Sequence, residues 1–171
     1  MVVQTKWTER KFNFDIPIGI FPCIIERLRG TPGRAEELTR NLSREILTKR
    51  VNAKWSIQEQ VGHLIETEKL HDGRIDDYLA NLSVLRAADM SNRATVQADY
   101  NGQNIKDVLA TLRTSRIHFI KRLEDVADEI LARTAIHPRL NLPMRLVDMT
   151  LFVAEHDDHH LGSIAGLVRL F

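Results

Sequence analysis

The last part of the chain carries the most regular pattern of apolar positions. Its members recur at steps of three or four residues: Met149, Val153, His156, His160, Ile164, Leu167 and Phe171. This spacing places side chains along one face of an α-helix and predicts a helix from about residue 144 to residue 170. Two histidines occupy positions on this face where apolar residues are expected.

Three further helices are predicted from the same kind of pattern. The first covers about residues 22–42, where Gly30 and Pro32 predict either a kink or two shorter helices. The second begins at Ser56, because Ser56 and Glu59 have the spacing of a capping box, and runs to about residue 82. The third covers about residues 105–126.

The segments between these helices have different patterns. Residues 1–21 lack helical periodicity and are expected to form an extended lead-in that packs over a single domain of residues 22–171. Residues 83–101 are predicted to form a long crossover, and Pro138 and Pro143 to bracket a loop. No alternation of apolar and polar residues is long enough to predict a β-strand, so the prediction is an all-α four-helix bundle.

Composition narrows the class of protein. The 171 residues include 24 Lys and Arg against 23 Asp and Glu, a formal charge of +1 that does not favour a nucleic-acid partner. A mean hydropathy of −0.24 disfavours membrane spans. The single cysteine, Cys23, cannot form an internal disulfide, and the first residues lack the apolar run of a secretory leader. We therefore expect a cytoplasmic protein that binds neither nucleic acid nor membrane.

The two histidines on the last helix have the spacing of a metal-binding pair. His156 and His160 differ by about 40° around the helix and about 6 Å along it, so their rings project over the same place. Neutral imidazole is a strong ligand for Zn²⁺, Ni²⁺, Fe²⁺ and Mn²⁺, among which the pattern does not choose. A third ligand is expected from a facing helix, where His63 borders the apolar face. Three protein ligands leave coordination positions open, as in catalytic zinc sites.

Two other interpretations of these residues were weighed. Buried histidines commonly form hydrogen bonds with core partners and bind no metal. The pairs Glu59–His63 and Asp157–His160 faintly resemble the ligand pairs of di-metal bundles, but the helix over residues 105–126 has no centrally placed carboxylate. Two histidines on one core face favour a site for a single ion.

The remaining histidines are less informative. His159 is about 100° around the helix from His160 and is expected to be partly exposed, with a role as a proton shuttle as the alternative. His137 lies in the loop before the last helix, where lining the pocket is the less favoured interpretation. His71 is predicted to flank the site, and His118 to be structural.

Three acidic residues lie close to the histidines in sequence. Glu66, Asp157 and Asp158 are expected to be solvated or to orient an imidazole N–H group.

Two segments together resemble a known family. They are residues 55–64, with Trp55 eight positions before His63, and residues 154–164, which hold the H-x-x-x-H pair. This pattern resembles the DinB/YfiT-like superfamily from about residue 22 to the end. The resemblance implies an up-up-down-down four-helix bundle with one divalent metal, and it carries the ligand roles onto His63, His156 and His160.

The resemblance also implies an activity. The superfamily includes thiol-dependent S-transferases, a thiol-dependent isomerase and proteins described as metal-dependent hydrolases. It implies an enzyme whose metal activates a low-molecular-weight thiol or water to attack a small-molecule substrate. The alternative is a non-catalytic metal-binding or stress-response bundle that acts as a dimerisation module. Many members are homodimers, and the apolar end of this chain, which includes Leu170 and Phe171, is consistent with that state.

Overall fold

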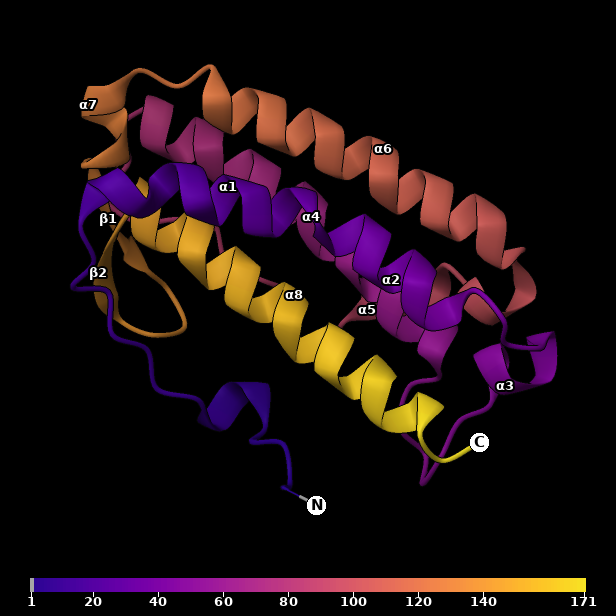
Figure 1. Cartoon of the computed structure of the whole chain (residues 1–171). Helices are drawn as coiled ribbons and strands as arrows, with labels where there is room; N and C mark the ends of the chain where they lie inside the picture. The colour runs from indigo at the N-terminus through magenta and orange to yellow at the C-terminus, as the bar shows by residue number, and fades with distance from the viewer. Residues whose placement is uncertain (1) are drawn as a thin grey trace.

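Four long helical segments lie side by side in the structure, a computed structural model that describes residues 2–171 (Figure 1). The four-helix bundle predicted from the sequence is confirmed. None of the helices in residues 2–171 has the length and apolar character needed to cross a membrane. The four segments are α1 with α2 (Phe21–Arg29 and Thr31–Thr39), α4 (Ile57–Leu79), α6 (Ile105–Glu124) and α8 (Leu146–Val168).

Local sequence signals account for where two of these segments begin and break. The first is two short helices, as Gly30 and Pro32 predicted, with Pro32 in the first turn of α2, where its missing N–H group costs no hydrogen bond. Ser56 caps α4: its Oγ accepts from the Glu59 N–H group (3.1 Å), and a Glu59 carboxylate oxygen accepts from the Ser56 N–H group (2.9 Å). This reciprocal pair satisfies two amide donors that the helix leaves free.

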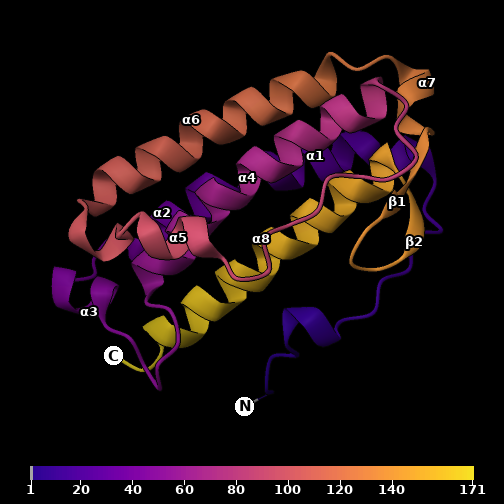
Figure 2. The same cartoon turned by 180° about the vertical axis from the view of Figure 1, so that it is seen from behind.

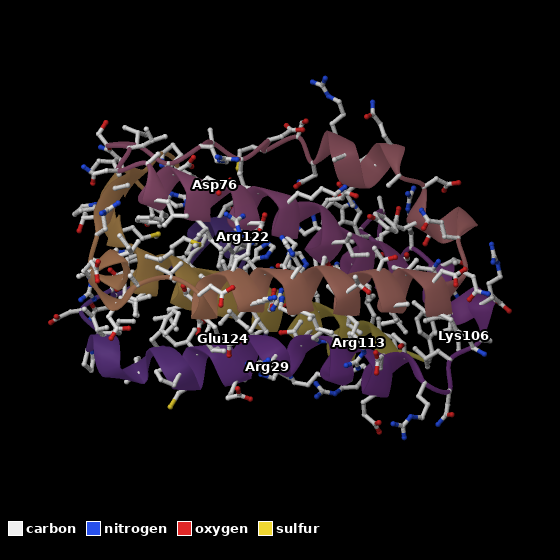
Figure 3. The ribbon with its side chains drawn as sticks, turned by 90° about the horizontal axis from the view of Figure 1, so that it is seen from above. Arg29, Asp76, Lys106, Arg113, Arg122 and Glu124 are labelled. Carbon is white, nitrogen blue, oxygen red and sulfur yellow. The ribbon has the colours of Figure 1, made fainter. Side chains whose placement is uncertain are left out.

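Contacts between the helices establish their relative directions. Arg29 pairs with Glu124 (2.6 Å) and Arg113 with Glu36 (2.7 Å), so α6 runs antiparallel to α1 and α2 (Figure 3). The guanidinium of Arg122, near the end of α6, contacts the later part of α4, which makes α4 and α6 parallel. Arg27 pairs with Glu155 and Arg34 with Asp158, so α8 runs parallel to α1 and α2. The order of directions is therefore up-down-down-up. The up-up-down-down order implied by the resemblance is wrong for this chain.

The connection after α4 explains that order. Residues 80–104, which include α5 (Arg93–Gln97) and a 3₁₀ turn at Tyr100–Gly102, return along the bundle to the end where α4 began (Figure 2). Because the crossover spans the whole helix length, α6 starts beside the start of α4 and runs parallel to it. The Tyr100 ring packs so closely on α4 that a Cβ atom at Gly62 would lie 2.2 Å from it.

A short hairpin joins α6 to α8, where the sequence had suggested only a loop. After α7 (Asp128–Leu131), β1 (Thr134–His137) pairs antiparallel with β2 (Leu142–Arg145). The Leu85 N–H group of the crossover donates to the Ile136 carbonyl (3.0 Å) and extends this pairing. Strands of four residues are too short to show alternation, so the prediction of no strands was wrong here. A short helix, α3 (Arg44–Thr48), was also not predicted.

The N-terminal segment lies along α8 (Figure 1). Residues 2–20 contain two 3₁₀ turns, Trp7–Glu9 and Ile18–Ile20, and are otherwise extended. Within this segment the Trp7 and Phe12 rings lie 4.9 and 5.1 Å from the Phe152 ring, and the Arg10 guanidinium pairs with Glu155. These contacts cover the part of α8 that precedes its two paired histidines.

Two apolar clusters fill the bundle, one toward each end. The cluster nearer the hairpin includes Ile75 of α4, and the other includes Val61 and Leu64. Polar side chains are buried on α4 between these positions and on the facing helices. This buried polar layer comprises His63, Glu68, His71, Arg74, Arg116, His156, Asp157 and His160.

Leu170 and Phe171 at the C-terminus are exposed. The homodimer expected at this apolar end stays a prediction.

Candidate metal centre

Three histidines converge in the polar layer. His156 and His160 project from successive turns of α8, and His63 projects from α4. The two helices are antiparallel, because His63 lies near His160 and His71 lies near His156. Each offers one ring nitrogen, and these nitrogens all lie within 4.8 Å of one another. All three side chains are buried, with 6 to 7% of each residue exposed. The one-turn spacing of His156 and His160 thus brings their rings together, and the facing helix supplies the third.

Two neutral polar side chains orient these rings. The His160 Nδ1–H group donates to the amide oxygen of Gln60 (2.5 Å), because that oxygen can only accept. His63 Nδ1 lies 3.1 Å from the Thr95 hydroxyl oxygen. Both contacts leave Nε2 as the nitrogen free for a ligand, and outer hydrogen bonds of this kind are typical of metal-binding histidines.

The geometry fits a metal ion. The Nε2 atoms of His156 and His160 lie 3.1 Å apart, close to the separation of about 3.3 Å between two nitrogens that bind one tetrahedral Zn²⁺ at 2.0–2.1 Å. His156 Nδ1 is buried and has no hydrogen-bond partner among residues 2–171. Three nitrogen donors at this spacing match a site for one divalent ion.

Burial keeps the three imidazoles in the form that binds metals. It lowers the pKa of His63 to about 4, and it lowers the pKa values of His156 and His160 well below their ordinary value. Each ring is therefore neutral at pH 7, with a lone pair available.

A cavity of about 360 Å³ opens beside the three histidines. Aromatic side chains form much of its wall: the Trp55 ring lies 4.6 Å from the His63 ring, and the Trp7 ring lies 5.0 Å from the His156 ring. Trp7 was not predicted to take part, because its position depends on the path of the N-terminal segment. The centre therefore lies on the wall of an open, largely apolar pocket.

Three more histidines line this cavity. His71 is buried with its ring 5.9 Å from the His156 ring but is outside the three-histidine ligand group, consistent with the prediction that it flanks the site and is not a ligand. The structure places His137 in the wall, with its ring 5.1 Å from the Phe152 ring. The half-buried His159 is held by Gln4, whose amide donates to its carbonyl oxygen (2.8 Å).

The other expectations concern residues outside the cavity. His118 is exposed on α6, so its predicted structural role is not supported. Asp157 binds Arg116 and the Thr31 hydroxyl (2.7 Å), and Asp158 pairs with Arg27 and Arg34, so neither orients a histidine of the centre.

Glu66 lines the cavity but is not a ligand of the three-histidine group. Its carboxylate accepts from the Tyr100 hydroxyl (2.7 Å) and from Lys69 (2.7 Å). Glu59 caps α4 and pairs with Arg50. Among residues 2–171 the candidate ligand group contains no carboxylate, and a di-metal centre has no support.

Histidine burial predicts a pH dependence for the stability of the metal-free protein. Burial places the pKa of His71 well below the ordinary value of 6.5, so below that pH the unfolded chain binds a proton that the folded chain does not. Stability is therefore lost as pH falls. We expect His71→Gln to reduce the slope by up to about 1.4 kcal/mol per pH unit below pH 6.5, measured by urea unfolding from pH 7 to 5.

The exposed His118 provides the matched control. His118→Gln is expected to keep the slope of the parent, because this side chain is two-thirds exposed. Equal slopes for the parent and both variants would contradict the assignment of His71 as a buried neutral imidazole.

Comparisons with known proteins agree with this architecture. The family model of the DinB superfamily matches residues 27–164. The solved structure of YfiT from Bacillus subtilis, described as a probable metal-dependent hydrolase with an unusual four-helix bundle topology, superposes with a TM-score of 0.80. The two chains are 20% identical, and the match covers 95% of this chain and 93% of the other. No curated protein sequence matches this chain. The structural likeness shows a shared fold.

Proposed function

Because the chain belongs to the DinB superfamily, we propose that it is a metal-dependent hydrolase whose ion is bound by His63, His156 and His160. One observation carries the proposal: three buried, neutral imidazoles converge on the wall of an open cavity. Three protein ligands leave coordination positions free, which is typical of catalytic sites. The shared fold of YfiT, described as a probable metal-dependent hydrolase, supports the same class of reaction.

The chain's own residues have distinct parts in this proposal. A bound divalent ion supplies Lewis-acid activation of water near neutral pH. Gln60 and Thr95 hold two of the ligand rings in orientation. Trp7 and Trp55 limit the access of solvent and offer apolar contact to a substrate.

Glu66 supplies an ionised carboxylate on the cavity wall. Burial tends to raise its pKa, but hydrogen bonds from Lys69 and Tyr100 outweigh that effect and hold the pKa below its ordinary value. The group is therefore charged at neutral pH and adds a negative charge to the cavity wall.

The proposal is tested by metal analysis followed by assays of hydrolysis. Protein purified without a His-tag is expected to contain about one equivalent of a transition metal. It is expected to cleave members of a panel of small esters and amides, to lose this activity with a chelator and to regain it when the ion is restored. The absence of bound metal, even after reconstitution, would contradict the proposal. Product formed only when a low-molecular-weight thiol is added would replace hydrolysis with thiol transfer, which stays a prediction.

A further inference from the structure

Two arginines occupy the cavity at a distance from the three histidines. Arg74 follows His63 by eleven residues on α4. Eleven residues make three helical turns plus about 20°, so both side chains project from the same face of the helix, about 16 Å apart along its axis. Arg139 lies between β1 and β2. Both line the cavity together with His137.

The charge of Arg74 is buried without a carboxylate partner. The residue is 1% exposed, and its Nε–H and Nη2–H groups donate to the Arg86 carbonyl oxygen (3.2 and 3.1 Å). Its Nη1 atom lies 3.3 Å from His137 Nε2. Burial lowers the pKa of Arg74 to about 10, which leaves it charged at pH 7. A buried guanidinium without an anion is costly, so this site favours an anionic ligand.

Arg139 is also incompletely satisfied. Its guanidinium carbon lies 5.9 Å from the centre of the Trp7 ring and 5.7 Å from that of Phe152, a position typical of cation–π contact. Its Nη2 atom is buried and has no hydrogen-bond partner within residues 2–171. The guanidinium of Arg139, which lines the cavity, therefore has a hydrogen-bond donor that no group in the described residues satisfies.

The nearby carboxylates are already used by other groups. Asp77 pairs with Arg86 (2.7 Å), and Asp89 accepts from the hydroxyl of Ser91 (2.6 Å). Glu66 is bound to Tyr100 and Lys69, as described above. None of these acids forms an ion pair with Arg74 or Arg139 in the described part of the chain, and this end of the cavity keeps a net positive charge.

We infer that Arg74 and Arg139 bind a carboxylate of the substrate, so that the enzyme acts on organic acids. Planar guanidinium groups match the geometry of a carboxylate and form charge-assisted hydrogen bonds with it. The Trp7 and Phe152 rings, which lie beside Arg139, would contact the apolar body of such a molecule. The assignment of this molecule as a substrate rests on the proposed function, because its reacting bond would extend toward His63, His156 and His160.

Calorimetric titration of the metal-free protein tests the subsite separately from the metal. The probes are 3-phenylpropionate and its neutral amide, which differ in charge but little in shape. The parent is expected to bind the acid at least tenfold more tightly than the amide. Arg139→Met and Arg74→Met are each expected to weaken binding of the acid at least tenfold while affinity for the amide stays the same.

Replacement of a surface arginine serves as the control, and the Arg139→Met variant is the decisive test of the inference. Arg113→Met, which removes an exposed partner of Glu36, is expected to leave both affinities unchanged. Arg139 is only half-buried, so its replacement tests the inference even if Arg74→Met fails to fold. Equal affinity of the parent for the two probes, no binding of the acid, or unchanged binding of the acid by Arg139→Met would overturn it. Failure of metal binding or hydrolysis leaves this titration unaffected, so the two proposals fail independently.

Discussion

Replacing His156 and His160 together with alanine is expected to reduce bound transition metal from about one equivalent to none. The double variant removes two of three nitrogen donors, and a single imidazole at His63 binds a divalent ion weakly. Elemental analysis of the untagged parent and variant measures the change directly. Hydrolysis by the metal-loaded parent is expected to disappear in parallel.

His159 offers a matched control on the same helix. Its carbonyl accepts from Gln4, and it is outside the group whose ring nitrogens converge. His159→Ala is therefore expected to retain the metal, and circular dichroism should show that each variant keeps its helices. Metal retained by the His156→Ala/His160→Ala variant would assign the ion to other residues and disprove the ligand set.

Replacing Arg116 with methionine is expected to lower the free energy of unfolding by about 3–5 kcal/mol. Arg116 is 1% exposed and lies between two buried carboxylates. Its Nε–H group donates to Glu68 (2.6 Å), and its Nη1–H group donates to Asp157. Methionine fills much of the same volume but leaves both acids without their counterion. Urea unfolding at pH 7 measures the loss.

Two comparison variants separate charge from packing. Glu68→Gln/Arg116→Met/Asp157→Asn removes all three charges and is expected to recover most of the lost stability, because neutral replacements of buried ion networks are often tolerated. Arg113→Met breaks an exposed ion pair and is expected to cost at most about 1 kcal/mol. An Arg116→Met variant as stable as Arg113→Met would show that the buried network contributes little.

The Arg116 network also bears on the metal centre. Asp157 follows His156 directly on α8, and its carboxylate binds both Arg116 of α6 and Thr31 of α2. These contacts from two other helices hold the turn that carries His156. The ion network of Arg116, Glu68 and Asp157 therefore lies beside the three histidines, within the buried polar layer between the two apolar clusters.

The sequence predicted the long helices well because their signals are local. The capping box placed the start of α4 beside Ser56, and Gly30 with Pro32 placed the break between α1 and α2. The hairpin was missed because each strand has only four residues and the crossover completes the pairing. The order of helix directions depends on that same crossover, whose path no local signal specifies.

Part of the candidate site was likewise predicted from local spacing, and part was not. The one-turn spacing of His156 and His160 predicted that their rings meet. Gln60 and Thr95, which orient the rings, were not predicted, and the expected carboxylate Asp157 is bound elsewhere. The sequence alone does not show which histidine ring the side chain of a given glutamine or threonine will contact, because these residues are on different elements.

The sequence by itself determined the approximate ends and the buried face of each long helix, and the pair of histidines one turn apart on α8. Those features follow from the constant rise and rotation of an α-helix, which depend only on neighbouring residues. The tertiary structure alone decided that His71 faces His156, and that Arg74 and Arg139 line one cavity. Such contacts join residues far apart in the chain, and they depend on how the crossover, the hairpin and the N-terminal segment pack.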